Sequence, residues 1–512
     1  MTEAQTLEHW AATTPHAVAV AGDDGELTYA QWNDDADRLA EHLHRQGVNA
    51  GDRVAVRCRI RREWFIANRA IGKLGAEHLA LNWRLTPREC RQILAQAGAV
   101  ALVCDDLRPE ALLQELEPLG LRCVLTLDVG VRAEWDAVLA GGPAPAREGP
   151  SQVPQLVYTS GTTGLPKGVS WLDRLPADPE LRDTYFTAIA TTPPRAERPR
   201  TLLTMPLHHS AGYYETVFTH ERGGLLCLLD PFDAERALRL IQDHRITHWL
   251  AVPTMFLRIR ALPQETFDSY DVSSLRTLQT GAAPVPQSVK AWIAESFGDD
   301  VLWELYGTTE VASISAIAPA EHSQRPGSSG RPLPGVELRI VDPAWHDVPV
   351  GQTGEIAVKT PATIGRYFGQ GDFNSQTMSP EGFLRTGDAG HVDEDGFLYI
   401  TDRYKDMIVA GGSNIYPAEV EAALLEHPAV VDCAVVGVPD SDLGEQPVAF
   451  VELRPGSSPT QDEVLQFLLT RLAKYKHPRQ IHLGVALPRN PVGKVLKQQL
   501  REPYWRGRER AV

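Results

Sequence analysis

The chain has 512 residues, of which 43% are hydrophobic and 23% are charged, and its formal net charge is −16. This length predicts two to four domains, and the composition is typical of a globular protein rather than a disordered or fibrous one. The negative charge argues against a general nucleic-acid binder and against attachment to an anionic membrane surface. It leaves room for a nucleotide, which needs only a local positive site.

The cysteines and the amino-terminal residues indicate in which cellular compartment the protein is expected. The six cysteines form no CxxC pair and no Cys/His cluster with metal-ligand spacing, and most lie among apolar residues, so we expect buried free thiols. Residues 1–15 include acidic side chains but no apolar core segment, which argues against a signal peptide. No apolar run approaches the length of a membrane-spanning helix. We therefore expect a cytoplasmic protein without stable membrane association.

The N-terminal part of the chain alternates between strand and helix patterns. Residues 27–58 are predicted to form a strand, a helix, a tight turn and a second strand. Helices are predicted at 65–75 and 87–97, and a strand follows at 100–104. Such alternation predicts a parallel sheet flanked by helices. Residues 140–154, rich in Gly, Pro and Ala, are predicted to be a connecting segment.

A run rich in Ser, Thr and Gly follows a short apolar strand between Leu156 and Val169, with the sequence LVYTSGTTGLPKGV. It exposes backbone N–H groups and hydroxyls, and Lys167 adds a positive charge at its end, so the segment has the groups needed to hold a polyphosphate. It is not a Walker A loop, because Pro166 precedes the lysine and Gly168 follows it. The alternative is a surface turn, which the density of these groups directly after a strand disfavours.

The pattern of polar and apolar residues divides the chain after this loop into segments of different predicted structure. Residues 177–199 are polar and contain several prolines, and we predict no regular element there. Strand–helix units resume between 202 and 280, with a helix at 233–244. From about residue 336, short strands separated by turns predict a small β-rich subdomain, and the last part of the chain is predicted to be compact α+β.

Five motifs follow one another along the chain: YTSGTTGLPKG (158–168), YGTTE (306–310), RTGD (385–388), DRYKDMIVAGGSNIYPAEVE (402–421) and PRNPVGKVLK (488–497). In this order they resemble the acyl-adenylate-forming superfamily, which includes acyl- and aryl-CoA ligases, firefly luciferases and the adenylation domains of peptide synthetases. The match covers nearly the whole chain. It implies an α/β fold in which a large N-terminal domain of βα-layered sheets (1–403), with the β-rich subdomain, precedes a small mobile α+β domain (404–512).

The resemblance also implies a reaction. A carboxylate attacks the α-phosphate of ATP, pyrophosphate leaves, and a thiol captures the acyl adenylate. Its motifs most resemble those of aryl-CoA ligases, including those for halobenzoates. We therefore expect an ATP- and Mg²⁺-dependent ligase that acts on an aromatic acid and CoA. It is expected to be a monomer or homodimer without nucleic-acid partners. Alternatives are another acceptor (a carrier-protein thiol or an amine), an unusual acid such as nitrite, or a nucleotide-binding protein that has lost catalysis. Joint retention of the charged motif residues argues against the last.

Most of the motifs are implied in binding ATP and Mg²⁺. The loop from Thr159 to Lys167 would hold the β- and γ-phosphates, because its hydroxyls and N–H groups match their oxygens. Tyr306 offers a flat face for adenine, and Asp388 can accept both ribose hydroxyls. Glu310 is a hard oxygen ligand suited to Mg²⁺. The implied nucleotide-binding residues are Thr159, Ser160, Gly161, Thr162, Thr163, Gly164, Lys167, Gly281, Ala282, Ala283, Glu304, Leu305, Tyr306, Gly307, Thr308, Thr309, Asp388, Ile400, Arg403 and Lys494.

Other motif residues are implied in catalysis and domain movement. Lys494 would neutralise the charge that builds on the α-phosphate and the attacking carboxylate. Lys405 matches the hinge at which the C-terminal domain swings between the two half-reactions, and Gly411 and Gly412 belong to the loop used in the CoA step. The implied catalytic residues are Lys494, Thr163, Lys167 and Glu310, with Glu310 as the metal ligand.

The acyl pocket is implied by the segment MPLHHSAGYYE (205–215), in which His209 takes the place of an aromatic or histidine residue that borders the pocket. Peptide-synthetase domains carry an Asp here to pair with an amino group, so its absence argues against an α-amino acid. The mixture of small, aliphatic and aromatic residues suits a short flat acid such as a benzoate or cinnamate. Gly307 is expected to let substrate and nucleotide approach the backbone. The implied pocket residues are His209, Ser210, Tyr213, Leu250, Thr280, Leu305, Gly307, Ala312 and Ser313.

The chain departs from the family pattern directly after Gly168. Many relatives have a helix with a histidine at this point, whereas here the sequence SWLDRLPADPE intervenes, with Pro176 and Pro179. The loop entrance and the adjacent pocket wall are therefore the part of the site that the resemblance does not predict.

Overall fold

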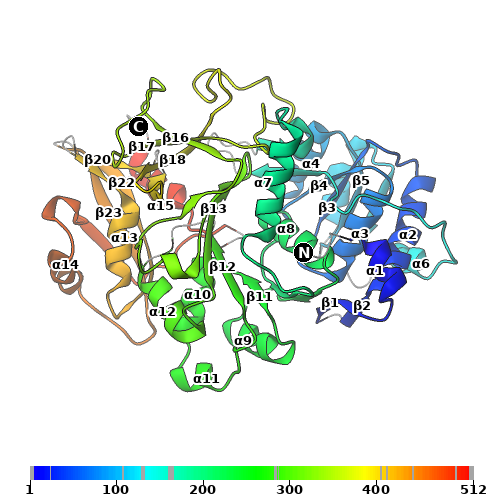
Figure 1. Ribbon diagram of the computed structural model, residues 1–512, viewed down its shortest axis with the longest axis horizontal. Coiled ribbons are helices and arrows are strands. Elements are labelled where there is room, and N and C mark those ends of the chain that lie inside the picture. The colour runs from blue at the N-terminus through cyan, green and yellow to red at the C-terminus, as the bar shows by residue number, and fades with distance from the viewer. Residues whose placement is uncertain are drawn as a thin grey trace.

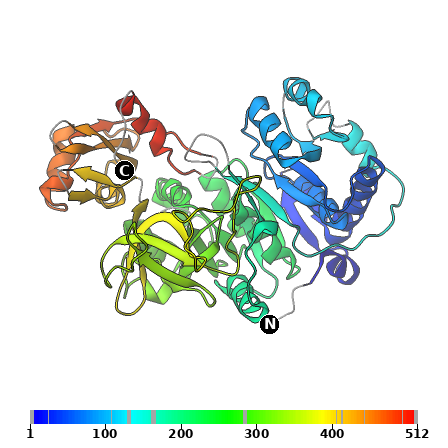
Figure 2. The ribbon, with the colours of Figure 1, turned by 90° about the horizontal axis from the view of Figure 1, so that it is seen from above.

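The computed structural model describes residues 5–23, 25–106, 109–127, 133–159, 167–281, 285, 287–403, 406–410, 413–440, 443–490 and 493–506. Within these residues the strands form four sheets. Figure 1 shows a large N-terminal domain, coloured blue to yellow, and a small C-terminal domain, coloured orange to red. Seen from above in Figure 2, the C-terminal domain lies at the end of the molecule opposite the blue N-terminal sheet. The predicted α/β fold with a small α+β C-terminal domain is confirmed.

The first sheet carries the predicted phosphate loop. Its strands run in the order β6-β5-β3-β4-β7-β8, and the neighbouring pairs are parallel except β7 and β8, which are antiparallel and flank residues 160–166. The predicted parallel sheet is therefore confirmed. The strands are β3 (Arg53–Arg57), β4 (Glu77–Ala80), β5 (Ala99–Cys104), β6 (Cys123–Thr126), β7 (Gln155–Thr159) and β8 (Lys167–Ser170).

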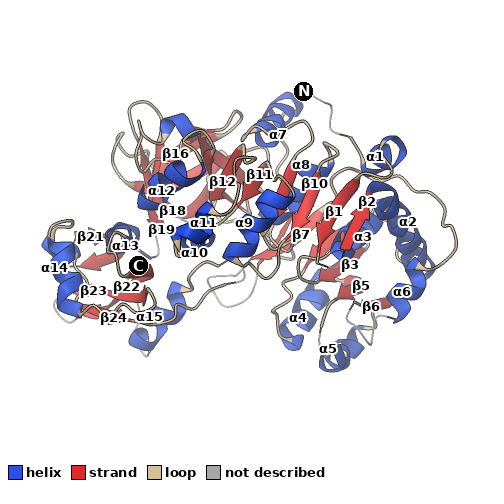
Figure 3. Ribbon diagram, turned by 90° about the horizontal axis from the view of Figure 1, so that it is seen from below, coloured by secondary structure: helices blue, strands red, loops and turns tan. Residues whose placement is uncertain are grey.

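Helices cover both faces of this sheet (Figure 3). Val54 and Val56 of β3 face one core cluster with α2 and α3, and Ala55 faces another with α4 and α5, because successive side chains of a strand point to opposite faces. The helix predicted at 87–97 is confirmed: Thr86 and Glu89 form a capping box at its start. The helices are α2 (Tyr29–Arg45), α3 (Arg62–Lys73), α4 (Pro87–Ala97), α5 (Pro109–Leu116) and α6 (Ala133–Leu139).

The second sheet carries the YGTTE motif. Its order is β15-β14-β13-β12-β11-β9-β10-β1-β2, and the strands from β13 to β1 are parallel. The strand–helix units predicted between 202 and 280 are confirmed. The strands are β1 (Val18–Gly22), β2 (Gly25–Thr28), β9 (Arg200–Leu203), β10 (Leu225–Leu228), β11 (His248–Leu250), β12 (Thr277–Gly281), β13 (Leu302–Thr308), β14 (Ala312–Ile317) and β15 (Arg331–Pro332), and the helices are α8 (Ser210–His220), α9 (Ala234–Asp243), α10 (Pro253–Arg260) and α12 (Gln287–Phe297).

The two remaining sheets confirm the predicted β-rich subdomain and the predicted α+β structure of the last part of the chain. An antiparallel sheet of β16 (Glu337–Val341), β17 (Gly354–Lys359), β18 (Leu384–Val392) and β19 (Leu398–Arg403) forms the β-rich subdomain. The C-terminal domain pairs β22 (Val430–Asp440) with β23 (Gly444–Leu453), joined by β20 (Ile408–Ala410), β21 (Ser413–Ile415) and β24 (Gln480–Leu483). Its helices are α13 (Pro417–Leu425), α14 (Gln461–Leu469) and α15 (Lys497–Trp505).

The polar residues 177–199 contain a helix that we did not predict. Helix α7 (Pro179–Thr191) starts at a proline, and the Asp178 side chain accepts a hydrogen bond from Leu181 N at 3.0 Å. Proline is well tolerated in the first helical turn, where its missing N–H would have no partner in any case, and Asp is a favoured N-cap. Pro179 therefore marks the start of a helix, whereas Pro193, Pro194 and Pro199 lie in the irregular segment after it.

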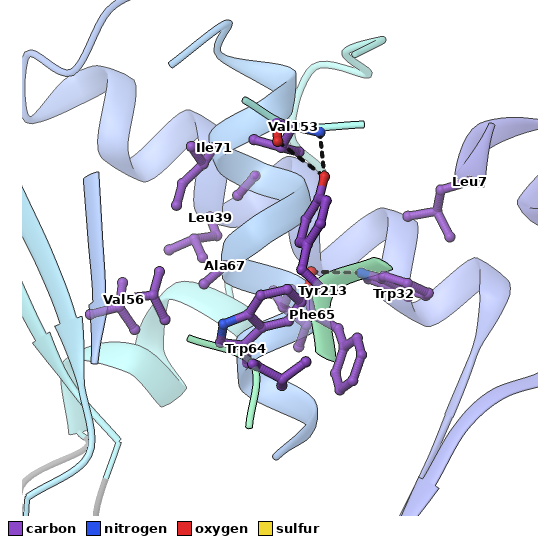
Figure 4. Packing of buried hydrophobic residues seen from close by; sticks show 14 of the residues in the cluster. Leu7, Trp32, Leu39, Val56, Trp64, Phe65, Ala67, Ile71, Val153 and Tyr213 are labelled. Carbon is purple, nitrogen blue, oxygen red and sulfur yellow. Dashed lines mark hydrogen bonds between the residues drawn. The ribbon is translucent and has the colours of Figure 1, made fainter. Parts of the chain in front are cut away.

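Large aromatic residues pack among aliphatic ones in the core between the first two sheets (Figure 4). The Trp32 Nε1–H donates to Phe65 O at 2.9 Å, which joins α2 to α3. Tyr213 of α8 is 1% exposed, and its hydroxyl donates to Val153 O at 3.0 Å and accepts from Val153 N at 2.7 Å. These bonds fix α8 against the segment that leads into the phosphate loop. The six cysteines are free and buried, as predicted.

A buried lysine holds the connecting segment before β7. The Lys73 side chain is 0% exposed, and its ammonium lies 2.8 Å from Asp37 Oδ1 and 3.1 Å from Glu8 Oε1. It also donates to Asn33 Oδ1 at 2.8 Å and to Arg147 O at 2.7 Å. Because Arg147 belongs to the segment predicted to connect to the loop strand, this ion cluster anchors the loop from behind.

We expect Lys73→Ala to lower the free energy of unfolding by about 3–5 kcal/mol, because it leaves the buried Asp37 carboxylate without its compensating charge. Urea denaturation followed by tryptophan fluorescence measures this change. Lys359→Ala is the matched control, since the Lys359–Glu337 pair is about half exposed on both sides and such pairs contribute about 0–1 kcal/mol. Equal effects of the two substitutions would contradict a buried anchoring role for Lys73.

Among the described residues, no helix is both long and apolar enough to cross a membrane.

Candidate functional site

The carboxyl ends of the central strands bring several predicted residues together. Leu250 ends β11, and the register of β11, β12 and β13 places Leu250 beside Gln279 and Thr280 beside Glu304. Thr280 is fully buried, and its hydroxyl has no hydrogen-bond partner among the described residues. A buried hydroxyl without a partner is costly, so this edge of the second sheet is suited to receive a polar ligand group.

At two predicted site positions, Gly281 and Gly307, the neighbouring backbone leaves no space for a side chain. A Cβ at Gly307 would lie 2.3 Å from Ala312 O, and one at Gly281 would lie 2.4 Å from Leu305 O. The pairing of β13 with β14 is irregular at Tyr306/Gly307, and Ala312 has a φ of 58°. The close approach of these strands is therefore a sufficient reason for glycine at 307, apart from any contact with substrate.

Tyr306 and Asp388 meet across the second and third sheets. The Tyr306 hydroxyl donates to Asp388 Oδ2 at 2.7 Å, and Asp388 is 7% exposed. In the ladder of β18 and β19, the backbone of Arg403 pairs with Asp388, and that of Ile400 with Gly390. The residues implied in adenine and ribose binding therefore share one place, although they come from motifs about 80 residues apart.

Tyr367, which belongs to none of the five motifs, links the two charged residues of the phosphate region. Its hydroxyl donates to Glu310 Oε1 at 3.1 Å, and the Lys167 ammonium lies 4.7 Å from the centre of its ring. Among the described residues, neither Lys167 nor Glu310 has an oppositely charged partner within 4.0 Å. The only sequence signal was an aromatic pair, Tyr367–Phe368, in a glycine-flanked loop.

The loop that carries Tyr367 is fixed to the strand that follows the phosphate loop. Phe368 N donates to Gly168 O at 2.7 Å, and the Arg53 guanidinium lies 4.6 Å from the centre of the Phe368 ring. Arg53 in turn pairs with the buried Glu77, which accepts a 2.7 Å hydrogen bond from Ser170 Oγ. The position of Tyr367 beside Lys167 is thus supported from the first sheet.

Two predicted site residues have their side chains in structural roles. The Glu304 carboxylate pairs with Lys290 of α12 and accepts from Ser329 Oγ at 3.3 Å. Burial raises its pKa, which the Lys290 charge opposes. Tyr213 lies in the core, with its hydroxyl occupied by Val153. The Glu304 side chain thus belongs to a buried ion pair and the Tyr213 side chain to the core, and their implied contacts with nucleotide and acid stay predictions.

Two histidines precede helix α8. His209 occupies the N-cap position, and its ring lies 4.6 Å from that of His208. Burial lowers the pKa of His209 to about 4, and burial lowers that of His208 well below its ordinary value. Both rings are therefore neutral at neutral pH. The two ring nitrogens of His208 are buried without a hydrogen-bond partner among the described residues.

The loop of Lys494 lies against the N-terminal domain. Asn490 N donates to Lys494 O at 2.8 Å and Lys494 N to Asn490 Oδ1 at 2.8 Å, which closes a tight turn. Asn490 and Gly493 line a cleft of about 230 Å³ whose opposite wall includes His208 and Thr254. A Cβ at Gly493 would lie 2.8 Å from Thr254 Oγ1. The two domains therefore share this cleft, and the Lys494 turn closes one side of it.

Several predicted residues lie outside the described residues or are described only in part. Of Arg403 only the backbone is described. Thr308 and Thr309 are partly exposed at the end of β13. Three residues implied in the acyl pocket are also partly exposed: Ser210 at the start of α8, and Ala312 and Ser313 at the start of β14. Outside the described residues are Ser160, Gly161, Thr162, Thr163, Gly164, Ala282, Ala283, Lys405, Gly411 and Gly412.

The charged residues fit a magnesium nucleotide. Mg²⁺ is commonly held by one or two carboxylates together with substrate phosphates and water, and Glu310 is a partly exposed carboxylate with no cation within 4.0 Å among the described residues. The described residues contain no cluster of three or more His, Cys, Asp or Glu side chains that would hold a metal alone. A metal at Glu310 would therefore depend on phosphate oxygens brought by the nucleotide.

Comparisons with known proteins agree with this geometry. The pattern of the family described as AMP-binding enzyme matches residues 7–368, and that of the AMP-binding enzyme C-terminal domain matches residues 419–494. The chain is 35% identical over 508 residues to a feruloyl-CoA synthase from Amycolatopsis sp., with 98% of this chain and 99% of the relative covered. It is 32% identical over 516 residues to a fatty acid–[acyl-carrier-protein] ligase from Streptomyces coeruleorubidus, with 99% and 97% covered. ATP-bound MatB from Rhodopseudomonas palustris has a similar structure, with a TM-score of 0.83, 28% identity and coverage of 98% of this chain and 99% of that chain.

Proposed function

The chain belongs to the AMP-binding enzyme family, and from this we propose that it is an AMP-forming acid–thiol ligase acting on an aromatic carboxylic acid, ATP and CoA. In the first step the carboxylate of the acid attacks the α-phosphate of ATP and pyrophosphate leaves. In the second, the CoA thiol attacks the acyl carbonyl of the adenylate, the thiol proton is released and AMP leaves.

The proposal rests on the opposite charges gathered at Tyr367. Lys167 and Glu310 contact the ring and the hydroxyl of the same tyrosine, and neither has an oppositely charged partner within 4.0 Å among the described residues. A structural pair would place such charges against each other. Charges held apart by a neutral aromatic group are suited to a ligand that carries both signs, which a polyphosphate with its bound cation does.

We assign the roles of the other charged motif residues from their positions in the structure and in the family motifs. Asp388, oriented by the Tyr306 hydroxyl, would accept the ribose hydroxyls. Lys167 would hold the departing phosphates, and Glu310 would hold Mg²⁺, which when bound neutralises charge on the phosphate oxygens. Lys494 would approach the α-phosphate from the C-terminal domain. We further propose a boundary between residues 1–403 and 404–512, with Lys405 as hinge and Gly411 and Gly412 in the loop of the CoA step.

Pyrophosphate release tests the first half-reaction. Purified protein with ATP and Mg²⁺ is supplied with a panel of benzoates, cinnamates and aliphatic acids, with and without CoA. We expect release with at least one aromatic acid, and an acyl-CoA product when CoA is present. Absence of release with every acid would overturn the proposed adenylation.

A carrier-protein thiol is the second candidate acceptor, and one relative favours it: the Streptomyces coeruleorubidus enzyme is named as a ligase for an acyl carrier protein. The same assay decides between the acceptors when phosphopantetheinyl carrier protein replaces CoA. A thioester formed with the carrier protein alone would replace CoA in the proposal and leave the adenylation step intact.

Tyr367→Phe is expected to weaken magnesium-dependent binding of ATP about 10-fold or more, because residues that orient a metal ligand commonly account for 10- to 100-fold in metal affinity. The phenyl ring keeps the contact with Lys167, so ATP binding without Mg²⁺ should change little. Tyr367→Leu removes both contacts and should weaken ATP binding under both conditions.

Calorimetric titration with ATP, with and without Mg²⁺, measures both effects without turnover. Tyr399→Phe is the matched control, since the Tyr399 hydroxyl contacts Asp393 at 3.2 Å away from this cluster. Should Tyr367→Phe bind Mg²⁺ and ATP as the parent protein does, the proposed link to Glu310 is wrong.

A further inference from the structure

The segment SWLDRLPADPE, which departs from the family pattern, is fixed to the site by its backbone. Leu175 N donates to Thr363 O at 2.7 Å and Gly365 N to Asp173 O at 3.1 Å, so residues 173–175 run beside 363–365. Ile364 N donates in turn to Glu310 O at 3.0 Å. Arg174 is therefore held one strand away from the backbone of the YGTTE motif.

The Arg174 guanidinium lies in a partly buried aromatic box. It lies 5.0 Å from the centre of the Trp171 ring and 5.1 Å from that of Phe186, and its Nη2 donates to the Tyr214 hydroxyl at 3.3 Å. The Trp171 and Tyr214 rings stack at 5.1 Å. The faces of the guanidinium are thus covered by rings, and its N–H edge keeps donors beyond the one used by Tyr214.

No carboxylate balances this charge within 4.0 Å among the described residues. The nearest acid in sequence, Asp173, pairs with Arg366 at 2.9 Å instead. Arg195 provides the comparison, because it also reaches helix α8 but pairs there with the buried Glu215 at 2.8 Å. An arginine that only joined structural elements would be expected to have such a partner, and Arg174 does not.

The elements around Arg174 are those that surround the implied acyl pocket. Tyr214 lies on α8, which begins directly after His209. The neighbour of Phe186, Tyr185, donates its hydroxyl to Val311 O at 2.9 Å and to Ser313 O at 2.8 Å, so α7 is held against the turn that contains the pocket residues 312 and 313. The guanidinium therefore contacts α7 and α8, the two helices fixed to segments that the resemblance implies in the acyl pocket.

We propose that Arg174 is a specificity-determining residue, and that the activated acid carries a second oxygen acceptor group, a carboxylate or a phenolic oxygen, at its end away from the reacting carboxylate. This rests on the proposed function and narrows its substrate class. The guanidinium edge matches two acceptor oxygens at once, and the Tyr214 hydroxyl adds a donor beside it. An unsubstituted ring would offer no acceptor to these partly buried donors, and a site that hydrogen-bonds a polar group of its substrate discriminates against the analogue that lacks the group.

Matched acids test the proposal: benzoate against terephthalate and 4-hydroxybenzoate, and cinnamate against 4-hydroxycinnamate. We expect the parent protein to favour an acceptor-bearing acid, measured as kcat/KM for pyrophosphate release. Arg174→Met keeps the aliphatic stem and should lower kcat/KM for that acid about 10- to 10²-fold, the range for hydrogen bonds to charged groups, and should change that for the unsubstituted acid by less than about threefold. Arg174→Lys should restore part of the preference, and Tyr214→Phe should lose part of it.

Leu172→Ala is the control, since Leu172 is 67% exposed in the same segment. Equal losses for substituted and unsubstituted acids would overturn the proposal, as would a parent protein without preference for acceptor-bearing acids. Calorimetric binding of the same acids to the parent protein and to Arg174→Met gives a readout independent of turnover. If binding discriminates but no acid releases pyrophosphate, the proposed function fails while the role of Arg174 stands.

Discussion

Lys494→Ala is expected to lower the rate of acyl-adenylate formation by about 10²–10³-fold, the loss found when one donor to a developing oxyanion is removed. The ammonium would act only where charge builds on the α-phosphate and the attacking carboxylate. Binding of ATP should therefore change little, because Lys167, Glu310 and Asp388 lie on the N-terminal domain. The variant should also convert a supplied acyl adenylate and CoA to the thioester at nearly the parent rate.

The position of the Lys494 turn makes the predicted separation of the two steps testable. The Lys494 turn lies at the cleft shared with the N-terminal domain, and its shape is fixed by Asn490. Lys474→Ala is the matched control, since Lys474 is an exposed lysine of the same domain. Single-turnover pyrophosphate release measures the first step, and thioester formation from synthetic adenylate measures the second. Normal adenylation by Lys494→Ala, or an equal loss in both steps, would contradict the role given to this lysine.

Local patterns were sufficient to predict much of the fold. The helix predicted at 87–97 has the bounds observed for α4, and the alternation of strands and helices predicts the first parallel sheet. These signals depend on residues close together in the sequence. Helix α7 was not predicted because proline usually indicates a loop or turn, whereas Pro179 begins the helix directly after the N-cap Asp178.

The candidate site could be predicted only where a motif gave the residue type. Asp388 and Tyr306 were both implied, but their 2.7 Å contact depends on how the second and third sheets meet. Tyr367 and Arg174 were not predicted, because their significance lies in what surrounds them. Among the described residues, Tyr367 contacts two charged groups that have no oppositely charged partner within 4.0 Å, and Arg174 lies in an aromatic box without a carboxylate. Such relations arise from tertiary packing, which periodicity does not report.

Contacts on both sides of residues 404 and 405 allow a test of the proposed hinge at Lys405. The backbone of Arg403 pairs with Asp388 in the β-rich subdomain. On the other side, Asp406 accepts from Arg501 of α15 at 3.0 Å. Residues 403 and 406 therefore have contacts in different domains, which is consistent with the proposed hinge between them. Lys405 itself lies outside the described residues.

Lys405→Pro is expected to lower the rate of thioester formation from a supplied adenylate by about 10²-fold, the cost of a misplacement of about 1 Å at a reacting centre, because proline fixes φ at the proposed hinge. Adenylation should fall much less, since the Lys494 turn already lies against the N-terminal domain. Lys405→Ala, which keeps the backbone free, should support both steps. Ser458→Pro, in an exposed loop of the same domain, controls for proline itself. Equal losses in both half-reactions would place the hinge elsewhere.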